Sequence, residues 1–296
     1  CAMPDFKGYI SDLGGPSANM YAMGGHDRSI CRKCVRPSCL HPSPCPNLNN
    51  DHALLLDIYK AVDDLPDVKK SFIGSGVRYD LAMASNKNER INTVNRRYVE
   101  KLIADHVSGR LKVAPEHTSD RVLDCMRKPS FSLFRKFKRI FDDVNKKYGM
   151  RQQLIPYFIS SHPACLEEDM AELAAITKDL DFHLEQVQDF TPTPMTLATE
   201  IYYTGYHPYT GEKVFTAKSQ QEKLAQRQFF FWYKPESRQQ IITELRRLNR
   251  PDILERLYPG QRGNSQDRSK STGPSRDKRN NSDFKRGNKR DKRGRF

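Results

Sequence analysis

The fold class is decided by the stretch Leu111-Lys112-Val113-Ala114-Pro115-Glu116-His117-Thr118-Ser119-Asp120-Arg121-Val122-Leu123-Asp124-Cys125-Met126-Arg127-Lys128, where one secondary-structure pattern gives way to another. A short apolar run ends at Pro115, a Thr-Ser-Asp cluster suits a helix N-cap, and apolar side chains then recur at helical spacing. This order predicts a strand, a tight loop and a helix. A carboxylate at the carboxyl end of a strand lies where α/β folds place ligand-contacting groups. Glu116 is therefore a candidate binding residue, although the sequence equally allows it to cap the following helix.

The same alternation of short apolar runs and amphipathic segments extends over residues 1–205. Strands are predicted at 7–13, 68–73, 111–114, 154–159 and 184–190. Helices are predicted at 54–65, 98–107, 131–148 and 167–176, and from residue 120 onward. Strands that alternate with helices pair in parallel through right-handed connections, so this pattern predicts an α/β fold built on a parallel sheet or barrel. Residues 1–205 form one domain in this interpretation.

The composition changes after this domain. Residues 206–258 are aromatic and helical, with helices predicted at 222–233, 239–248 and 252–257, and form a C-terminal extension. Residues 259–296 hold 13 Lys/Arg against 4 Asp/Glu, net +9 of the +14 of the chain, and almost no apolar side chains. Such a segment cannot bury enough apolar surface to offset its ordering entropy, so a disordered basic tail is predicted. The tail suits non-specific contact with RNA or an acidic partner, or a solubilising role.

The overall composition bounds the compartment and the partners. The chain has 37% hydrophobic residues and a mean hydropathy of -0.77, without a run of about 18 apolar residues. A cytoplasmic protein without a membrane segment is therefore expected. The first residue is Cys1 and the first methionine is Met3, which suggests a truncated chain.

Four of the seven cysteines lie in one insertion, the cysteine loop of residues 31–45, which is predicted to form no regular element. They follow the spacing Cys31-x2-Cys34-x4-Cys39-x5-Cys45. Two thiolates two residues apart can reach one ion, and two more complete a tetrahedral set, so a metal centre is predicted here. Zinc and an iron–sulfur cluster share this ligand type and are not separated by spacing. His41 can replace one cysteine, and four unliganded loop thiols are the alternative.

Short polar or glycine-containing sequences follow each predicted strand in order. They are Asp12-Leu13-Gly14-Gly15, Ser75-Gly76-Val77-Arg78, Pro115-Glu116-His117-Thr118-Ser119, Ser160-Ser161-His162-Pro163 and Thr191-Pro192-Thr193-Pro194. The ordered series resembles the radical SAM barrel, and it is similar to the YgiQ-type members over nearly all of residues 1–258. The resemblance implies a partial TIM-like (β/α)6 barrel that contains the second to sixth strands.

The resemblance also implies which residues contact S-adenosylmethionine (SAM). Gly14 and Gly15 match the glycines of a GGE-like turn. Ala114 to Asp120 is similar to G-x-E-S-G-S-D, with Glu116 and Ser119 matching. Ile159 to Asp169 is similar to I-x-G-x-P-G-E-T-E-E-D, where Ser161 replaces a glycine, and Pro192 to Ala198 resembles P-x-P-G-T-x-A. The implied SAM-binding residues are Gly14, Gly15, Glu116, Ser119 and Ser161.

The function implied is that of a radical SAM enzyme, which uses SAM and a [4Fe–4S] cluster to generate a 5′-deoxyadenosyl radical. Such enzymes hold the cluster through Cys-x3-Cys-x2-Cys after the first strand, and these 296 residues contain no such triplet. The triplet is therefore expected upstream of Cys1, the chain alone is expected to be inactive, and the cysteine loop would be a second metal centre. The substrate is not specified. Two alternatives are a nucleic-acid-binding protein with a four-cysteine site and a basic tail, and a structural zinc module.

Overall fold

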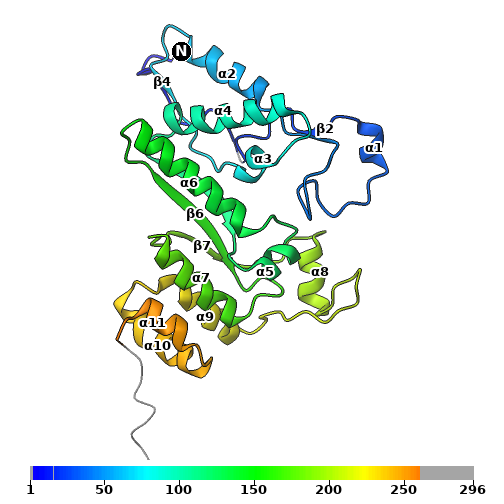
Figure 1. The fold of residues 1–296 in the computed structure, drawn as a ribbon, viewed down its shortest axis with the longest axis vertical. Coiled ribbons are helices and arrows are strands. Elements are labelled where there is room, and N and C mark those ends of the chain that lie inside the picture. The colour runs from blue at the N-terminus through cyan, green and yellow to red at the C-terminus, as the bar shows by residue number, and fades with distance from the viewer. Residues whose placement is uncertain (1–2, 16, 261–296) are drawn as a thin grey trace, which may run out of the picture. The chain divides into compact units, whose positions relative to one another are not determined.

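The computed structural model describes residues 3–15 and 17–260 (Figure 1). Pro16 and residues 261–296, which include most of the predicted disordered tail, lie outside the described residues. The description below therefore concerns the predicted α/β domain and its C-terminal extension.

Three parallel strands form the largest sheet. They are β5 (Arg110–Glu116), β6 (Gln153–Ser160) and β7 (Gln186–Asp189), hydrogen-bonded in that order. Every second residue of β6 is buried, as expected when successive side chains point to opposite faces of a strand. In this register Glu116 pairs with Phe158, and Ser160 pairs with Asp189. The carboxyl ends of the three strands therefore lie at one edge of the sheet.

Shorter strands precede this sheet. The strand β1 (Tyr9–Ile10) pairs in parallel with β4 (Lys70–Ser71), and β2 (Gly24–Gly25) pairs antiparallel with β3 (Leu48–Asn49). A parallel bridge between Val77 and Val113 connects the segment after β4 to β5. The described residues thus have a mixed α/β fold with two small parallel sheets, β1–β4 and β5–β6–β7. Within these residues the strands form no closed barrel.

Amphipathic helices enclose the core between the strands. The helices before β7 are α1 (Arg28–Arg32), α2 (Ala53–Asp63), α3 (Tyr79–Met83), α4 (Glu89–Asp105), α5 (Asp120–Cys125), α6 (Phe131–Lys147) and α7 (Glu167–Asp179). Figure 1 shows α6 running alongside β6, and the rings of Phe131 and Phe158 lie 6.4 Å apart between the two elements. Phe134 and Phe137, one turn apart on α6, are fully buried.

The C-terminal extension packs on the same core. After α8 (Leu197–Thr204), which ends the predicted domain, the extension contains α9 (Gln220–Arg227), the 3-10 helix η1 (Gln228–Phe231), α10 (Pro235–Arg247) and α11 (Pro251–Leu257). Phe229 and Phe230 of η1 are fully buried and belong to the cluster that includes Leu111 of β5. None of the helices in residues 3–15 and 17–260 combines the length and apolar character that crossing a membrane requires.

All five predicted strands are present, and the predicted helices are confirmed with shifted ends. The largest shift is in α4, which begins at Glu89 rather than residue 98 because the Asn88 side chain accepts a hydrogen bond from the Arg90 backbone N–H. The prediction that the cysteine loop forms no regular element was wrong at its start. There Cys31 lies in α1, which Asp27 caps through the Ser29 backbone N–H.

Candidate functional site

Glu116 ends β5 in a left-handed conformation, with a φ of +68°. This region is uncommon for residues other than glycine and concentrates at functional sites. The Glu116 Oε1 atom accepts a hydrogen bond from Lys128 Nζ at 3.2 Å, whereas Oε2 is buried and has no hydrogen-bond partner among the described residues. No backbone N–H of α5 is found to donate to this carboxylate in the described part of the chain. Its geometry is therefore that of a side chain with one free acceptor rather than of a helix cap.

The neighbouring strand ends are tied to one another by polar contacts. The Asp12 carboxylate after β1 accepts from the backbone N–H groups of Gly74 and Ser75 after β4, at 3.0 and 3.3 Å. Partial burial opposes ionisation, but hydrogen bonds from Ser75 and Gly74 outweigh it and lower the pKa of Asp12. The Arg78 guanidinium, also after β4, donates hydrogen bonds to the Asp80 carboxylate, which raise the pKa of Arg78 most, and the nearby charge of Glu116 raises it further. These loops, at residues 12–15, 17–19, 74–78, 116–119 and 160–163, are called the strand-end rim below.

At the end of β6, Ser161 repeats the conformation of Glu116, with a φ of +60°. Its backbone N–H donates to Gln226 Oε1 of α9 at 2.7 Å, and Gln226 Nε2 donates to the carbonyl of Cys165 at 2.8 Å. The Ser161 hydroxyl is buried without a described partner. The C-terminal extension thus fixes this strand end and leaves its hydroxyl free.

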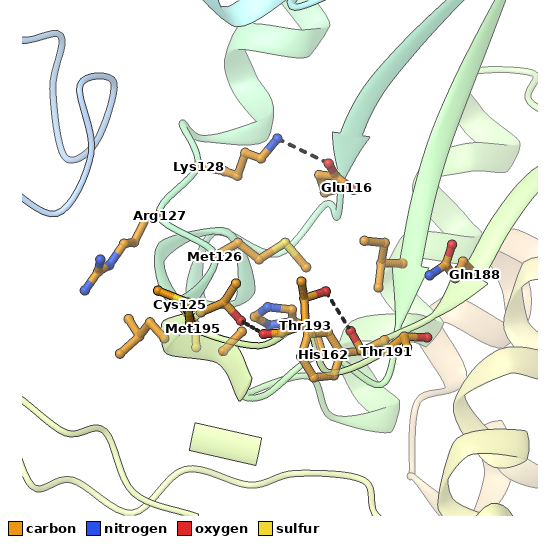
Figure 2. Close-up of a pocket in the computed structure, with 15 residues that line it drawn as sticks. Glu116, Cys125, Met126, Arg127, Lys128, His162, Gln188, Thr191, Thr193 and Met195 are labelled. Carbon is orange, nitrogen blue, oxygen red and sulfur yellow. Dashed lines mark hydrogen bonds and ion pairs between the residues drawn. The ribbon is translucent and has the colours of Figure 1, made fainter. Parts of the chain in front are cut away.

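A cavity of about 520 Å³ lies where β5, β6 and β7 end, and it is called the Glu116 cavity below. Figure 2 shows Lys128 reaching toward Glu116 while Arg127 points away from it. The other walls of the Glu116 cavity include His162, Gln188 and residues 195–198 at the start of α8. This volume is within the range of small-molecule sites, and the lining combines charged, polar and apolar side chains.

The cavity wall includes a neutral histidine. The Nδ1 atom of His162 is 2.8 Å from the Pro163 carbonyl, which can only accept, so Nδ1 carries the proton and Nε2 is a hydrogen-bond acceptor. Burial lowers the pKa of His162 to about 4, and the bond to Pro163 opposes this only in part. The ring of Phe190 holds the imidazole by an edge contact at 4.9 Å. Near neutral pH the cavity therefore presents a neutral acceptor opposite the charged Glu116 and Lys128 pair.

Of the five implied SAM-binding residues, Glu116 lines this cavity and the other four do not. Ser161 is at the adjacent strand end, and Ser119 donates its backbone N–H to His117 at the start of α5. Gly14 packs against Ala18, whose Cβ is 2.8 Å from the place a side chain at Gly14 would take, whereas nothing lies within 4 Å of that place at Gly15. Gly14 is thus needed for a close approach, which the GGE-like match alone does not reveal.

A buried pair behind the rim was not found from the sequence. His117 Nδ1 accepts from the Ser119 backbone N–H at 3.0 Å, so the proton is on Nε2, which lies 3.5 Å from Cys165 Sγ. Both side chains are fully buried. Burial, with smaller contributions from the charges of His162 and Arg121, lowers the pKa of His117 to about 3. Since the two residues are 48 positions apart, no local pattern could have indicated this contact.

The cysteine loop brings its four thiols into one neighbourhood. Partial burial, followed by the charges of Cys45, Cys31 and Cys34, raises the pKa of Cys39. Two sulfurs already accept N–H donors, Cys31 from the Asn47 amide at 3.3 Å and Cys34 from the Arg36 backbone at 3.4 Å. Hydrogen bonds of this kind are usual around metal-bound thiolates. Within residues 3–15 and 17–260, however, no three His, Cys, Asp or Glu side chains are arranged closely enough to hold a metal ion.

Comparisons with known proteins give relatives for most of the chain. A family model described as "Domain of unknown function (DUF3362)" matches residues 185–295. A UPF0313 protein of Bacteroides thetaiotaomicron is 70% identical over 256 residues, which are 86% of this chain and 41% of that protein. A UPF0313 protein of Porphyromonas gingivalis is 60% identical over 266 residues, or 90% of this chain and 42% of that protein. One of Methanocella arvoryzae is 45% identical over 252 residues, or 85% of this chain and 40% of that protein. The chain therefore spans about two fifths of the length of these relatives.

Proposed function

The chain belongs to the UPF0313 family, the family of the YgiQ-type proteins, and from this premise we propose that it is part of a radical SAM enzyme. In this proposal its strands are the second to sixth strands of a partial TIM-like (β/α)6 barrel. SAM and a [4Fe–4S] cluster, when bound, supply the 5′-deoxyadenosyl radical. The substrate is not specified. The ligand triplet of that cluster is assigned to a part of the whole protein outside these 296 residues.

One observation carries the proposal. The two superfamily patterns similar to residues 159–169 and 192–198 contain three glycines, and this chain has Ser161, Ala164 and Met195 in their places. All three residues are left-handed, with φ values of +60°, +73° and +64°. A conformation that favours glycine is uncommon for other residues, so its recurrence at these places supports a shared backbone path. The glycines of the pattern around Glu116 stand at Ala114 and Thr118, which are not left-handed, so the argument rests on the later strand ends.

The residues at the rim fit a bound SAM through their free polar atoms. Glu116 Oε2 and the Ser161 hydroxyl are both buried and unpartnered within the described chain, and a ribose hydroxyl or ammonium group can satisfy them. Lys128 holds the other oxygen of Glu116 and keeps the carboxylate in place. Gly14, Gly15 and Ser119 are proposed to contact SAM by backbone or hydroxyl groups. A second metal centre, zinc or iron–sulfur, is proposed at Cys31, Cys34, Cys39 and Cys45, where the loop must tighten around the metal.

The test is the substitution Glu116→Ala in a full-length UPF0313 protein that carries these residues, with its cluster reconstituted and reduced. Removing a charge-assisted hydrogen bond worth roughly 1.5–3 kcal/mol should weaken SAM binding about tenfold or more. The formation of 5′-deoxyadenosine should fall while iron content and thermal stability stay nearly unchanged. Glu100→Ala is the matched control, because Glu100 forms a surface ion pair with Lys147 on α6 and does not line the Glu116 cavity.

The contrary result is also specific. If Glu116→Ala leaves SAM cleavage intact and destabilises the protein by about 1 kcal/mol, the size of a lost helix cap, Glu116 has a structural role and the site assignment fails. The nucleic-acid-binding alternative predicts salt-dependent RNA affinity that survives Glu116→Ala but not removal of the tail, residues 259–296. Most of that tail lies outside the described residues, so RNA contact through it stays a prediction, as does a cytoplasmic location.

A further inference from the structure

A second cavity lies next to the Glu116 cavity and is not the one assigned to SAM above, and Cys34 and His41 of the cysteine loop are among the residues that line it. Its volume is about 640 Å³, and it lies between the cysteine loop and the turn that follows α8, which contributes His207 and Tyr209. We call it the Tyr209 cavity. Arg127 and Leu197 line both cavities, so the two share one wall. The volume suits a small molecule.

The charged groups of the Tyr209 cavity are mainly cationic. Its walls include the guanidinium groups of Arg36 and Arg127. Among the lining residues, all in the described part of the chain, the one carboxylate is Asp124, and it is paired with His41 Nε2 at 3.1 Å. The arginine and aspartate side chains of the lining together carry two positive charges and one negative charge. A cavity of this kind favours an anion.

Both guanidinium groups keep N–H donors for which no acceptor is found in the described part of the chain. Arg127 has a left-handed φ of +56°, and its Nη1 atom donates to the Pro37 carbonyl at 3.3 Å. This conformation turns Arg127 toward the Tyr209 cavity, while the next residue, Lys128, reaches Glu116 (Figure 2). Arg36 donates one Nη group to the Ser43 carbonyl, and its Nε is buried without a described partner. Buried donors without partners are costly and are expected to meet an acceptor on a ligand.

Apart from the Cys34 thiol, the remaining walls are apolar or aromatic. Val35, Pro37 and Leu197 contribute aliphatic surface. The guanidinium carbon of Arg127 lies 5.5 Å from the centre of the Tyr209 ring, and Tyr209 is 78% exposed, so much of its ring remains open to a planar group. A small inorganic ion would leave this surface uncovered. The ligand that fits has an anionic head and an apolar, planar body.

We propose that the Tyr209 cavity binds an organic anion, a small molecule with a carboxylate or phosphate group and a planar apolar body. Arg36 and Arg127 bind the anionic group, and Tyr209 stacks on the body. That this molecule is the substrate rests on the proposed function, because the shared wall at Arg127 places it beside the cavity assigned to SAM. The binding itself does not depend on SAM.

The probes are phenyl phosphate and benzoate, with benzyl alcohol as the neutral analogue. Their affinities for the full chain, purified anaerobically, are measured by titration calorimetry without SAM. Arg36→Gln and Tyr209→Ala should each weaken at least one anionic probe about tenfold, since a charge-assisted bond or a stacking contact is lost. The preferred probe identifies the head group. Arg139→Gln, an exposed arginine of α6 away from both cavities, should leave the affinities unchanged.

The proposal is overturned if neither anion binds, if benzyl alcohol binds as well as the anions, or if the Arg139 variant weakens the anions as much as the other two variants do. Tyr209→Ala guards against a local rearrangement in Arg36→Gln, because Tyr209 lies outside the cysteine loop. Thermal unfolding of each variant checks that it is folded. Since SAM is absent, a Glu116→Ala variant that keeps its SAM affinity contradicts the proposed function and leaves this binding result standing.

Discussion

The strand-end rim and the cysteine loop both carry candidate ligands, but they are stabilised in different ways. The strands behind the rim contain Leu111 and Phe158, which are fully buried and hydrogen-bonded through the parallel ladder. In the loop, α1 has no buried residue, and Cys31, Cys34 and Cys39 are exposed. Among the described residues, the buried apolar cluster that includes a residue of the loop is a small one, in which Leu40 packs with Leu48, Leu81 and Ala84. The rim is therefore positioned by the core of the protein, whereas the loop has little apolar burial to fix its four thiols.

This difference explains why the free polar atoms at the rim are informative. A buried, unpartnered Glu116 oxygen is held in place by packing that exists without any ligand. The thiols of the loop have no such support, so the present separation of the thiols does not argue against a metal. The predictions below test this contrast, from the largest effect to the smallest.

The largest effect is expected from removing one thiolate of the loop. Cys34→Ser should reduce the metal content of anaerobically purified protein from about one centre per chain to nearly none, because a tetrahedral thiolate site does not tolerate loss of one of its four ligands. Elemental analysis measures this. Cys125→Ser is the control, since Cys125 lies in α5 outside the loop and should leave the metal content unchanged. Four free thiols per loop and no metal in the unaltered protein would contradict the proposed second metal centre.

Next in size is the cost of core truncation behind the rim. Phe158→Ala should lower the free energy of unfolding by about 3–5 kcal/mol, because Phe158 is fully buried between β6 and α6 and the cavity left behind cannot close completely. Val35→Ala in the cysteine loop should change it by less than about 0.5 kcal/mol, because Val35 is 97% exposed. Urea unfolding midpoints compare the two. A similar loss for both variants would mean that the loop is as firmly packed as the rim.

The same contrast shows what the sequence could predict. The strand β6 was found because residues 154–159 form a short run of apolar and aromatic side chains, and α6 because its phenylalanines recur every three or four residues. The short helix α3 was missed because Tyr79, Asp80, Leu81 and Ala82 are all buried, which leaves no amphipathic pattern. Such local periodicity reports burial within one element and nothing about its neighbours.

A residue of the candidate site could be predicted from the sequence only where its own position along the chain was enough to indicate a role. Glu116 was found from its place at a strand end. Lys128, its partner, is twelve positions away across the left-handed turn at Arg127, and Gln226 reaches Ser161 from 65 positions away. Contacts of this length depend on the whole fold, so neither the ion pair nor the support from α9 has a signal in the local sequence.

The smallest effect concerns the buried imidazole behind the rim. Burial above all lowers the pKa of His117 from its ordinary value of 6.5 to about 3, so the folded protein keeps this side chain neutral where the unfolded chain protonates it. Below the ordinary pKa the unfolded state then binds more protons than the folded state, so the free energy of unfolding decreases as the pH is lowered. His117 thus stabilises the fold fully above about pH 6.5, and this contribution is lost as the pH falls toward about 3. At about pH 5 the loss is about 2 kcal/mol for this residue.

The measurement is the difference in unfolding free energy between about pH 8 and about pH 5, which cancels the cost that a substitution has at every pH. His117→Gln should reduce this difference by about 2 kcal/mol, even if the variant is less stable throughout because Cys165 loses its donor. His162 is also buried, with its pKa lowered to about 4, so part of the pH dependence remains in the variant. His26→Gln, which replaces an exposed histidine near the cysteine loop, should leave the difference unchanged. If His117→Gln leaves it unchanged as well, water reaches the imidazole, and the rim is less firmly closed than its packing indicates.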